Sequence, residues 1–261
     1  MKPNLLRQRL QERRLAVGHM VMEFSTRGIS KILEASGLDF VLLDMEHSGL
    51  ELERIADLVA WLKATPVAPI VRVPGAFYHF IARALDAGTL GIMAPNVETV
   101  EQARTIVNAV KYGPEGQRGL GLGCAHNDYV LPQPAEYLVR ANANTAVICQ
   151  IESVRGLENL DAIAALPGVD VLWVGHYDLT QSMGIVGQFQ HPRFLEALAR
   201  VAAVAKSHGK AAGIQPGSRE QAAEWIKLGY NVISYGSDIA VYRNALASGV
   251  AAVRELDSNH G

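Results

Sequence analysis

Short runs of apolar, β-branched residues alternate with longer stretches whose apolar residues recur every three or four positions, from Ala16 almost to the C-terminus. The short runs predict buried strands and the longer stretches predict amphipathic helices, which together indicate repeated β–α units. The eight predicted strands begin near Ala16, Phe40, Ala68, Gly91, Thr145, Val169, Ala211 and Asn231. The clearest helices are predicted over residues 52–63, 100–110, 194–208 and 220–228.

Eight short, mostly apolar strands, each followed by helical sequence, favour an α/β fold of the closed (β/α)8 or TIM-barrel type over an open doubly wound sheet. The 261 residues suit one such barrel, and no linker or low-complexity segment divides them. We therefore expect a single domain over residues 1–261. A polar-faced helix within the first twelve residues could lie across the barrel bottom, and segment 239–256 predicts a long Ala/Val-rich helix.

Two β–α units carry insertions, at residues 113–129 and 176–191. Loops that follow strands build the active face of such barrels, so extra length there indicates function. The Gly-rich run that begins at Arg118 lacks the Lys-Ser/Thr of a phosphate loop and the preceding strand of a dinucleotide-binding motif. We expect a flexible loop over the barrel mouth, with Arg118 contacting substrate or a neighbouring subunit.

Composition removes several classes of function. The formal net charge is −2 and no basic run occurs, which argues against nucleic acid as a partner. No apolar run reaches the roughly 18 residues that a membrane span needs, so no membrane partner is expected. The two cysteines, Cys124 and Cys149, and the charged N-terminal segment predict a reducing, cytoplasmic location rather than secretion.

The first polar constellation is Asp44 with His47, at the end of the apolar run FVLLDM. Strand alternation puts Leu42 and Asp44 on one face of the sheet. The Asp44 carboxylate could hold one tautomer of the imidazole and raise its basicity. A helix-capping Asp beside a surface His explains these two residues equally well when they are taken alone.

Arg72 lies near the end of the apolar strand in PIVRVPG, where a guanidinium cannot be buried without a partner. It either forms a structural ion pair or receives an anion, and its planar fork suits a carboxylate or enolate oxygen. The position at the carboxyl end of a strand favours the anion.

Two further carboxylates follow strands later in the chain. In TAVICQIES, alternation turns Gln150 and Glu152 inward and leaves Cys149 as a packing residue. Asp178 follows the strand that ends at Gly175, where it could instead be a helix N-cap. Glu152 and Asp178 would end adjacent strands on one barrel face, and their mutual repulsion indicates a bound divalent metal.

Carboxylate ligands without a His/Cys cluster favour Mg²⁺ or Mn²⁺, with Co²⁺ and Zn²⁺ kept as alternatives. Such an ion leaves positions open for a chelating 2-oxo acid, whose carbonyl it would polarise to ease formation of an enolate. Arg72 would share that negative charge. His47, oriented by Asp44, would move protons at the reacting carbon or at the aldol oxygen.

These residues stand in motifs that resemble the HpcH/HpaI aldolase family over nearly the whole chain: LLDMEHSGL, IVRVPG, GIMAPNVET, CQIESVRGLENL and VDVLWVGHYDLTQSMG. Within that family the chain is similar to 4-hydroxy-2-oxo-heptanedioate and 2-keto-3-deoxy sugar-acid aldolases. The resemblance implies reversible cleavage of a 4-hydroxy-2-oxo acid to pyruvate, or an analogue such as hydroxypyruvate, and an aldehyde, through a metal-bound enolate. It also implies a homo-oligomer, a hexamer built as a trimer of dimers, with an exchanged C-terminal helix.

The resemblance assigns a role to each suspected position. Asp44 and His47 handle protons beside Glu46, and Glu152 with Asp178 binds the metal. The residues that would contact substrate are Arg72, Gln150 and Gly175. Three departures from the family pattern, at Met20, at His176 and Tyr177, and at residues 73–75, leave the acceptor aldehyde open.

Two other functions fit the same residues. One is a citrate lyase β-type or phosphoenolpyruvate mutase-type carbon–carbon lyase, although Cys124 lacks the surroundings of a catalytic cysteine. The other is a barrel that binds a metal and a 2-oxo acid without turning it over. The presence of Asp44 and His47 favours an enzyme, because binding alone needs no proton-handling pair.

Overall fold

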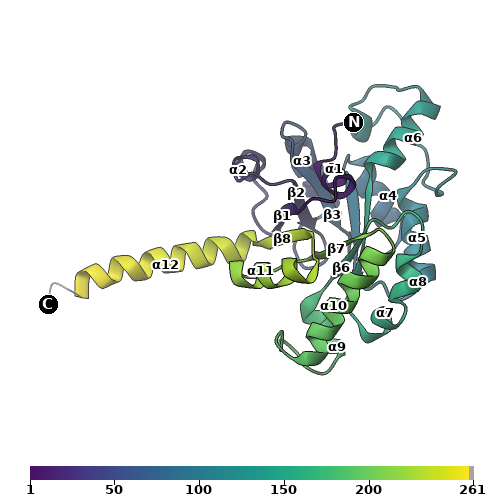
Figure 1. Ribbon diagram of the computed structural model, residues 1–261. Helices are drawn as coiled ribbons and strands as arrows, with labels where there is room; N and C mark the ends of the chain where they lie inside the picture. Colours follow the sequence, from purple (N-terminus) through teal and green to yellow (C-terminus); the bar gives the residue numbers. More distant parts are fainter. Residues whose placement is uncertain (259–261) are drawn as a thin grey trace.

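The computed structural model describes residues 1–258, and eight parallel strands close into one barrel in the order of the sequence (Figure 1). The predicted (β/α)8 fold is therefore confirmed. The strands are β1 (Ala16–Val21), β2 (Phe40–Asp44), β3 (Ala68–Arg72), β4 (Gly91–Ala94), β5 (Ala146–Ile151), β6 (Val171–Val174), β7 (Ala211–Ile214) and β8 (Val232–Ser237). Pairing of β1 with β8 closes the barrel, with one register shift between Gly18 and Met20.

Helices cover the outside of the barrel, and the four clearest predicted helices match α3, α5, α10 and α11 within a few residues. The helices are α1 (Leu5–Gln11), α2 (Ile29–Ala35), α3 (Leu52–Leu62), α4 (Tyr78–Asp86), α5 (Val100–Val110), α6 (Pro134–Asn144), α7 (Val154–Glu158), α8 (Leu160–Ala164), α9 (His176–Ser182), α10 (Pro192–Ser207), α11 (Arg219–Leu228) and α12 (Asp238–Ser258). The first insertion contains a short 3-10 turn, η1 (Ala125–Asn127), and the second contains α9.

Strand alternation divides the apolar residues into two cores. Leu42 and Ile148 point into the barrel interior with Phe40 and Trp173. Their neighbours in sequence, such as Leu43 and Cys149, instead pack in the layer between the strands and the helices. The shared face predicted for β2 and the inward direction predicted for β5 are thereby confirmed, and the polar residues at the ends of these strands are directed towards the barrel axis.

Helix α1 closes the amino-terminal end of the barrel, as the sequence pattern suggested. Leu6 is fully buried in the interior core. Asn4 caps the helix by accepting the Arg7 N–H, and its Nδ2 donates to the carbonyls of Leu90 and Asn144, each at 2.8 Å. With this end plugged, the carboxyl ends of the strands form the open face.

Helix α12 contributes little to the barrel and projects away from it as a single rod (Figure 1). Asp238 anchors its first turn, because the carboxylate accepts the backbone N–H groups of Met22, Glu23 and Phe24. Beyond this anchor the helix is exposed. None of the helices within residues 1–258 is long and apolar enough to cross a bilayer.

Candidate active site

Asp44 and Arg72 form the rigid centre of the polar cluster at the carboxyl ends of the strands. They are direct partners in the pairing of β2 with β3. Arg72 Nε and Nη2 donate to the two oxygens of Asp44 at 2.7 and 2.8 Å, and both side chains are buried. The structural ion pair considered for Arg72 is present, and the helix-cap alternative for Asp44 is wrong, because α3 begins at Leu52 after the N-cap Glu51.

Electrostatics reinforce this pair. Burial alone would lower the pKa of Arg72, but the hydrogen bond and charge of Asp44, together with the charges of Glu46 and Glu152, raise it. The guanidinium therefore stays charged. Its Nη2 also lies 3.9 Å from the sulfur of Met20, so Met20 packs beside the cation within the barrel.

Glu46 and His47 lie on the turn that follows β2. The Asp44 carboxylate accepts the backbone N–H groups of both residues, at 3.0 and 3.3 Å. The expected Asp44–imidazole contact is not formed, because that carboxylate is occupied by backbone amides and by Arg72. Instead, Nε2 of His47 lies 3.8 Å from Oε2 of Glu46, and the His47 side chain is 57% exposed.

Glu46 lies near both His47 and the Arg72 guanidinium. Its Oε2 lies 3.2 Å from Arg72 Nη1, yet this buried atom makes no hydrogen bond within residues 1–258. Burial raises the pKa of Glu46, and the charges of Asp44 and Asp178 add to that effect against the opposing charge of Arg72.

Gln150 and Glu152 come from the end of β5, on the inward face that alternation predicted. Gln150 Nε2 donates to Oε2 of Glu152. The backbone N–H of Asn96, just after β4, donates to Oε1 of Glu152 at 2.7 Å. Oε1 of Gln150 remains without a hydrogen-bond partner among the described residues, although it is buried.

Gly175, at the end of β6, covers the Glu152 carboxylate. A Cβ atom built on Gly175 would lie 2.1 Å from Oε2 of Glu152 and 2.9 Å from Nε2 of Gln150. Only a residue without a side chain lets the backbone pass this close. Gly175 is also the N-cap of α9, so Asp178 lies in the first turn and is not the N-cap considered from the sequence.

Glu152 and Asp178 lie within electrostatic reach of each other. The pKa of Glu152 is raised to about 7. Burial is the largest cause, hydrogen bonds from Gln150 and Asn96 oppose it, and the charges of Glu46 and Asp178 add to it. The Glu152 side chain is buried and Asp178 is exposed at the rim. The two carboxylates thus interact electrostatically, and their joint binding of a metal stays a prediction.

The donor set suits a hard divalent cation. The carboxylates of Asp44, Glu46 and Glu152 act electrostatically on Arg72. Asp178 acts on Glu46 and Glu152, so carboxylates outnumber the guanidinium in this cluster. Carboxylate oxygens are the ligands that Mg²⁺ and Mn²⁺ prefer, with water and substrate filling the other positions. No preformed group of three or more His, Cys, Asp or Glu ligands occurs within residues 1–258.

Three residues singled out from the sequence contact groups other than the carboxylates of this cluster. His176 packs against Phe189 and Trp225, with ring centroids 5.0 and 5.7 Å away, and burial lowers its pKa to about 4. The His176 ring is therefore uncharged and packed among aromatic side chains. The neighbouring Tyr177 side chain is 62% exposed. Arg118 is buried in an ion pair with Asp86 at 2.6 Å rather than free in a flexible loop.

Asn96 is the functional residue that sequence reasoning missed. Its φ of +54° lies in the left-handed region, and this conformation aims its N–H at Glu152. Asn directly after a strand tolerates that backbone conformation better than most residues do, which is the local signal available. Its partner, 56 positions away in sequence, leaves no local signal at all.

A (β/α)8 barrel with carboxylates, an arginine and a histidine at the carboxyl ends of its strands has the architecture of a barrel enzyme. Comparison with known proteins defines it further: the chain belongs to the HpcH/HpaI aldolase/citrate lyase family, whose profile matches residues 22–245. A 5-keto-4-deoxy-D-glucarate aldolase of Shigella boydii is 35% identical over 216 residues, 83% of either chain. Family membership makes this protein a carbon–carbon lyase of the aldolase type.

Solved structures agree with this assignment. An HpcH/HpaI aldolase/citrate lyase family protein from Burkholderia cenocepacia J2315 is 33% identical, with a TM-score of 0.89 over 96% of this chain and 99% of that one. A citrate synthase, SbnG, is 29% identical, with a TM-score of 0.87 over 97% and 98% of the two chains. The architecture thus serves more than one carbon–carbon bond reaction.

Proposed function

We propose that the protein is a divalent-metal-dependent aldolase that reversibly cleaves a 4-hydroxy-2-oxo acid into pyruvate, or an analogue such as hydroxypyruvate, and an aldehyde. The observation that carries the proposal is the electrostatic position of Glu152. This buried carboxylate shares its surroundings with Glu46 and Asp178, and its pKa is raised to about 7. Such a cluster is costly unless a cation compensates for it.

Glu152 and Asp178 are the residues that would hold Mg²⁺ or Mn²⁺, with Co²⁺ and Zn²⁺ as alternatives. Gly175 supports this role, because its missing side chain leaves room for the Glu152 carboxylate in its observed position. When bound, the ion supplies Lewis-acid polarisation of the 2-oxo group.

Arg72 supplies the fixed positive charge of the reaction. Its Nε and Nη2 are held by Asp44, so its orientation is set before substrate arrives. In the cleavage direction the 4-hydroxyl loses its proton, the bond between C3 and C4 breaks, and its electron pair passes into the pyruvate enolate. Arg72 stabilises the developing oxygen charge.

His47 is the proton carrier in this proposal. Its side chain is 57% exposed, so it can exchange protons with solvent, while Glu46 lies 3.8 Å from its Nε2. In cleavage it takes the proton of the 4-hydroxyl and then returns a proton to C3 of the enolate. Gln150, whose buried Oε1 has no described partner, supports substrate binding from the barrel floor.

The substrate class follows from the named relatives. Counted from its other end, a 5-keto-4-deoxy-glucarate is a 2-oxo acid with no hydroxyl on C3 and a hydroxyl on C4, which is the pattern that this cleavage requires. We propose that the substrate of this protein belongs to the same class, the sugar-derived 4-hydroxy-2-oxo diacids.

We also propose that the chain forms a homo-oligomer, a hexamer arranged as a trimer of dimers, through α12. Exposed apolar side chains recur along α12 at spacings of three and four residues, which places them on one face: Ile239, Tyr242, Leu246, Val250 and Val253. A projecting helix with such a face needs a partner surface to remove it from water. A second copy of this chain supplies that surface.

The cysteines support a reducing compartment. Cys124 and Cys149 are both free, and burial raises the pKa of Cys149 to about 12, so its thiol stays protonated and inert. We therefore keep the cytoplasm as the proposed location.

The decisive experiment follows exchange of the pyruvate methyl protons into deuterated water. With Mn²⁺ we expect rapid exchange, and chelation should abolish it. Glu152→Gln should abolish it as well, whereas Glu158→Gln, at an exposed position on α7, is the matched control that should behave as wild type. Replacing His47 by Asn should slow exchange about 100-fold to 10,000-fold without weakening Mn²⁺ binding. Undiminished exchange after complete metal removal contradicts the proposal, and pyruvate binding without exchange identifies a non-catalytic barrel.

A further inference from the structure

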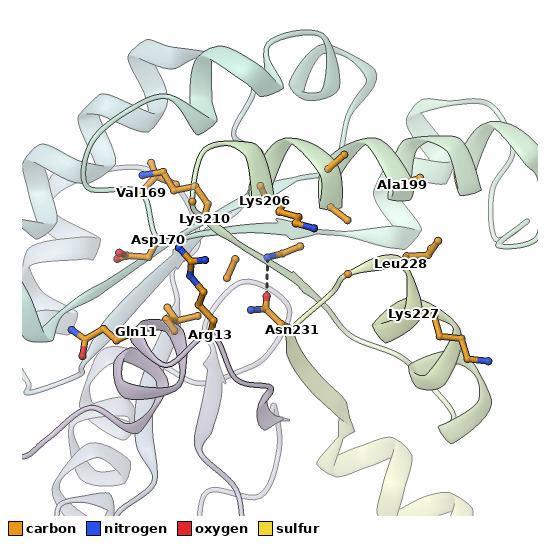
Figure 2. Close-up of a pocket in the computed structure, with 18 of the residues that line it drawn as sticks. Gln11, Arg13, Val169, Asp170, Ala199, Lys206, Lys210, Lys227, Leu228 and Asn231 are labelled. Carbon is orange, nitrogen blue, oxygen red and sulfur yellow. Dashed lines mark hydrogen bonds between the residues drawn. The ribbon is translucent and has the colours of Figure 1, made fainter.

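A cavity of about 810 Å³ lies at the amino-terminal end of the barrel, the end opposite to the carboxylate cluster. We call it the basal groove. Its walls come from α1, the second half of α10, the start of β7 and the end of α11 (Figure 2). Nothing in the aldol reaction uses this end of the fold.

The basal groove carries a strong excess of positive charge. Its cationic side chains are Arg7, Arg13, Lys206, Lys210 and Lys227. Its one acidic residue is Asp170, whose carboxylate is already engaged by the guanidinium of Arg7 and by the backbone N–H of Val147 at 2.8 Å. The remaining cations therefore have no acidic counterpart among the lining residues.

Three of these cations make no side-chain hydrogen bond or ion pair in the described part of the chain: Arg13, Lys206 and Lys227. Lys206 and Lys227 lie in the last turns of α10 and α11, where the helix dipole favours a positive charge. Arg13 lies outside a helix, so no helix dipole favours its positive charge. Lys210 donates only to the carbonyl of Leu166 at 3.3 Å, and burial lowers its pKa despite the nearby Asp170.

The floor of the basal groove is made of small residues, which leave space instead of filling it. They are Ala199, Ala202, Ala203, Ala205, Gly209, Ala211 and Ala212. Asn231 adds a polar edge: its Oδ1 accepts the N–H of Ala212 at 3.2 Å, which leaves its amide nitrogen as a donor (Figure 2). The cations at the rim suit a ligand with several anionic groups, and the alanine-lined floor leaves space for its compact carbon or phosphate skeleton.

We propose that the basal groove binds a small anion with two or more phosphate or carboxylate groups, at a site separate from the aldolase site. The volume falls within the range of small-molecule pockets. Arg13, in the turn after α1, and Lys206, on α10, line it, and charge-assisted hydrogen bonds from two sides would fix such a ligand. Because the groove spans α1, α10 and α11, an occupant would tie these elements together.

The test is calorimetric titration of the metal-free protein at low ionic strength. The probes are inorganic tripolyphosphate and tricarballylate, which separate a phosphate from a carboxylate preference. We expect saturable binding with one site per chain. The double variant Arg13→Gln with Lys206→Gln should weaken it at least about tenfold. The control, Arg104→Gln with Arg140→Gln, removes the same charge at exposed positions on α5 and α6 and should leave binding unchanged.

The unfolding temperature of each variant reports whether it folds, and the single change Lys227→Gln gives an independent second variant. Any of three outcomes overturns the proposal. The first is that neither probe binds saturably, and the second is that both double variants lose affinity equally, which indicates general charge attraction. The third is that a short single-stranded oligonucleotide binds more tightly than tripolyphosphate through the same residues. Loss of the aldolase activity is not a readout here, so failure of this proposal is distinct from failure of the proposed function.

Discussion

Arg72 and Asp44 are register partners on adjacent strands, and their side chains meet in a two-point contact buried at the carboxyl end of the barrel. The contact fixes the plane of the guanidinium, because both donors on one edge are occupied. The remaining edge, towards Glu46, is the part that can respond to a ligand. An arginine held in this way is preorganised for an oxyanion.

Arg72→Lys should lower kcat/KM for aldol cleavage roughly 100-fold to 1000-fold, because an ammonium cannot reproduce the two-point contact or its fixed orientation. Arg72→Ala should also destabilise the fold by about 3 to 5 kcal/mol, since Asp44 would remain buried without its cation. Steady-state kinetics and urea unfolding measure the two effects. Wild-type kinetics in the lysine variant would remove Arg72 from the proposed mechanism.

Gly175→Ala should damage the metal site more than the fold. The new Cβ would lie 2.1 Å from Oε2 of Glu152, so the carboxylate must move. We expect Mn²⁺ affinity to fall about tenfold or more, with a stability loss of about 1 to 3 kcal/mol. Gly28→Ala is the matched control, because nothing lies within 4 Å of a Cβ at that position. Unchanged Mn²⁺ affinity in Gly175→Ala would argue against Glu152 as a ligand.

The stability of the metal-free protein should depend on the protonation of Glu152. Its folded pKa of about 7 exceeds the ordinary value of 4.5, so the folded state holds this proton more tightly than the unfolded chain does. The resulting stabilisation is fully present below pH 4.5 and is lost as the pH rises through about 7. Its size is about 3 kcal/mol.

Urea unfolding between pH 5 and 8 measures this contribution. The free energy of unfolding of Glu152→Gln should fall less over this range than that of the wild type, because glutamine does not titrate. Glu158→Gln, which removes an exposed carboxyl, should keep the wild-type profile. Parallel profiles for the wild type and Glu152→Gln would show that burial does not raise the pKa of Glu152.

The apolar face of α12 should control assembly. Leu246→Glu with Val250→Glu places charge on that face, and we expect a hexamer in the wild type to become a smaller species. Asn244→Glu with Ser248→Glu adds the same charge to the opposite face of α12 and should preserve assembly. Light scattering after size exclusion gives the mass of each species. Equal masses for all three proteins would exclude α12 from the interface.

Local patterns in the sequence were sufficient for the barrel. Alternation along β2 correctly put Asp44 on the face of Leu42, and alternation along β5 correctly turned the Gln150 face inward, because the direction of a side chain on a strand depends on the parity of its position. Helical periodicity likewise located α3, α5, α10 and α11. The segment after β6 was less predictable, since packing against Phe189 and Trp225, distant in sequence, determines the surroundings of the His176 ring.

The sequence by itself therefore determined the eight-stranded architecture and the identity of the polar residues at the strand ends, since both follow from short-range periodicity. Only the tertiary structure decided which of those residues meet. Arg72 and Asp44 are 28 positions apart in sequence, and Asn96 and Glu152 are 56 apart. Strand register and barrel closure bring each pair into contact. The basal groove is a tertiary feature for the same reason, because α1, α10 and α11 converge only once the barrel has closed.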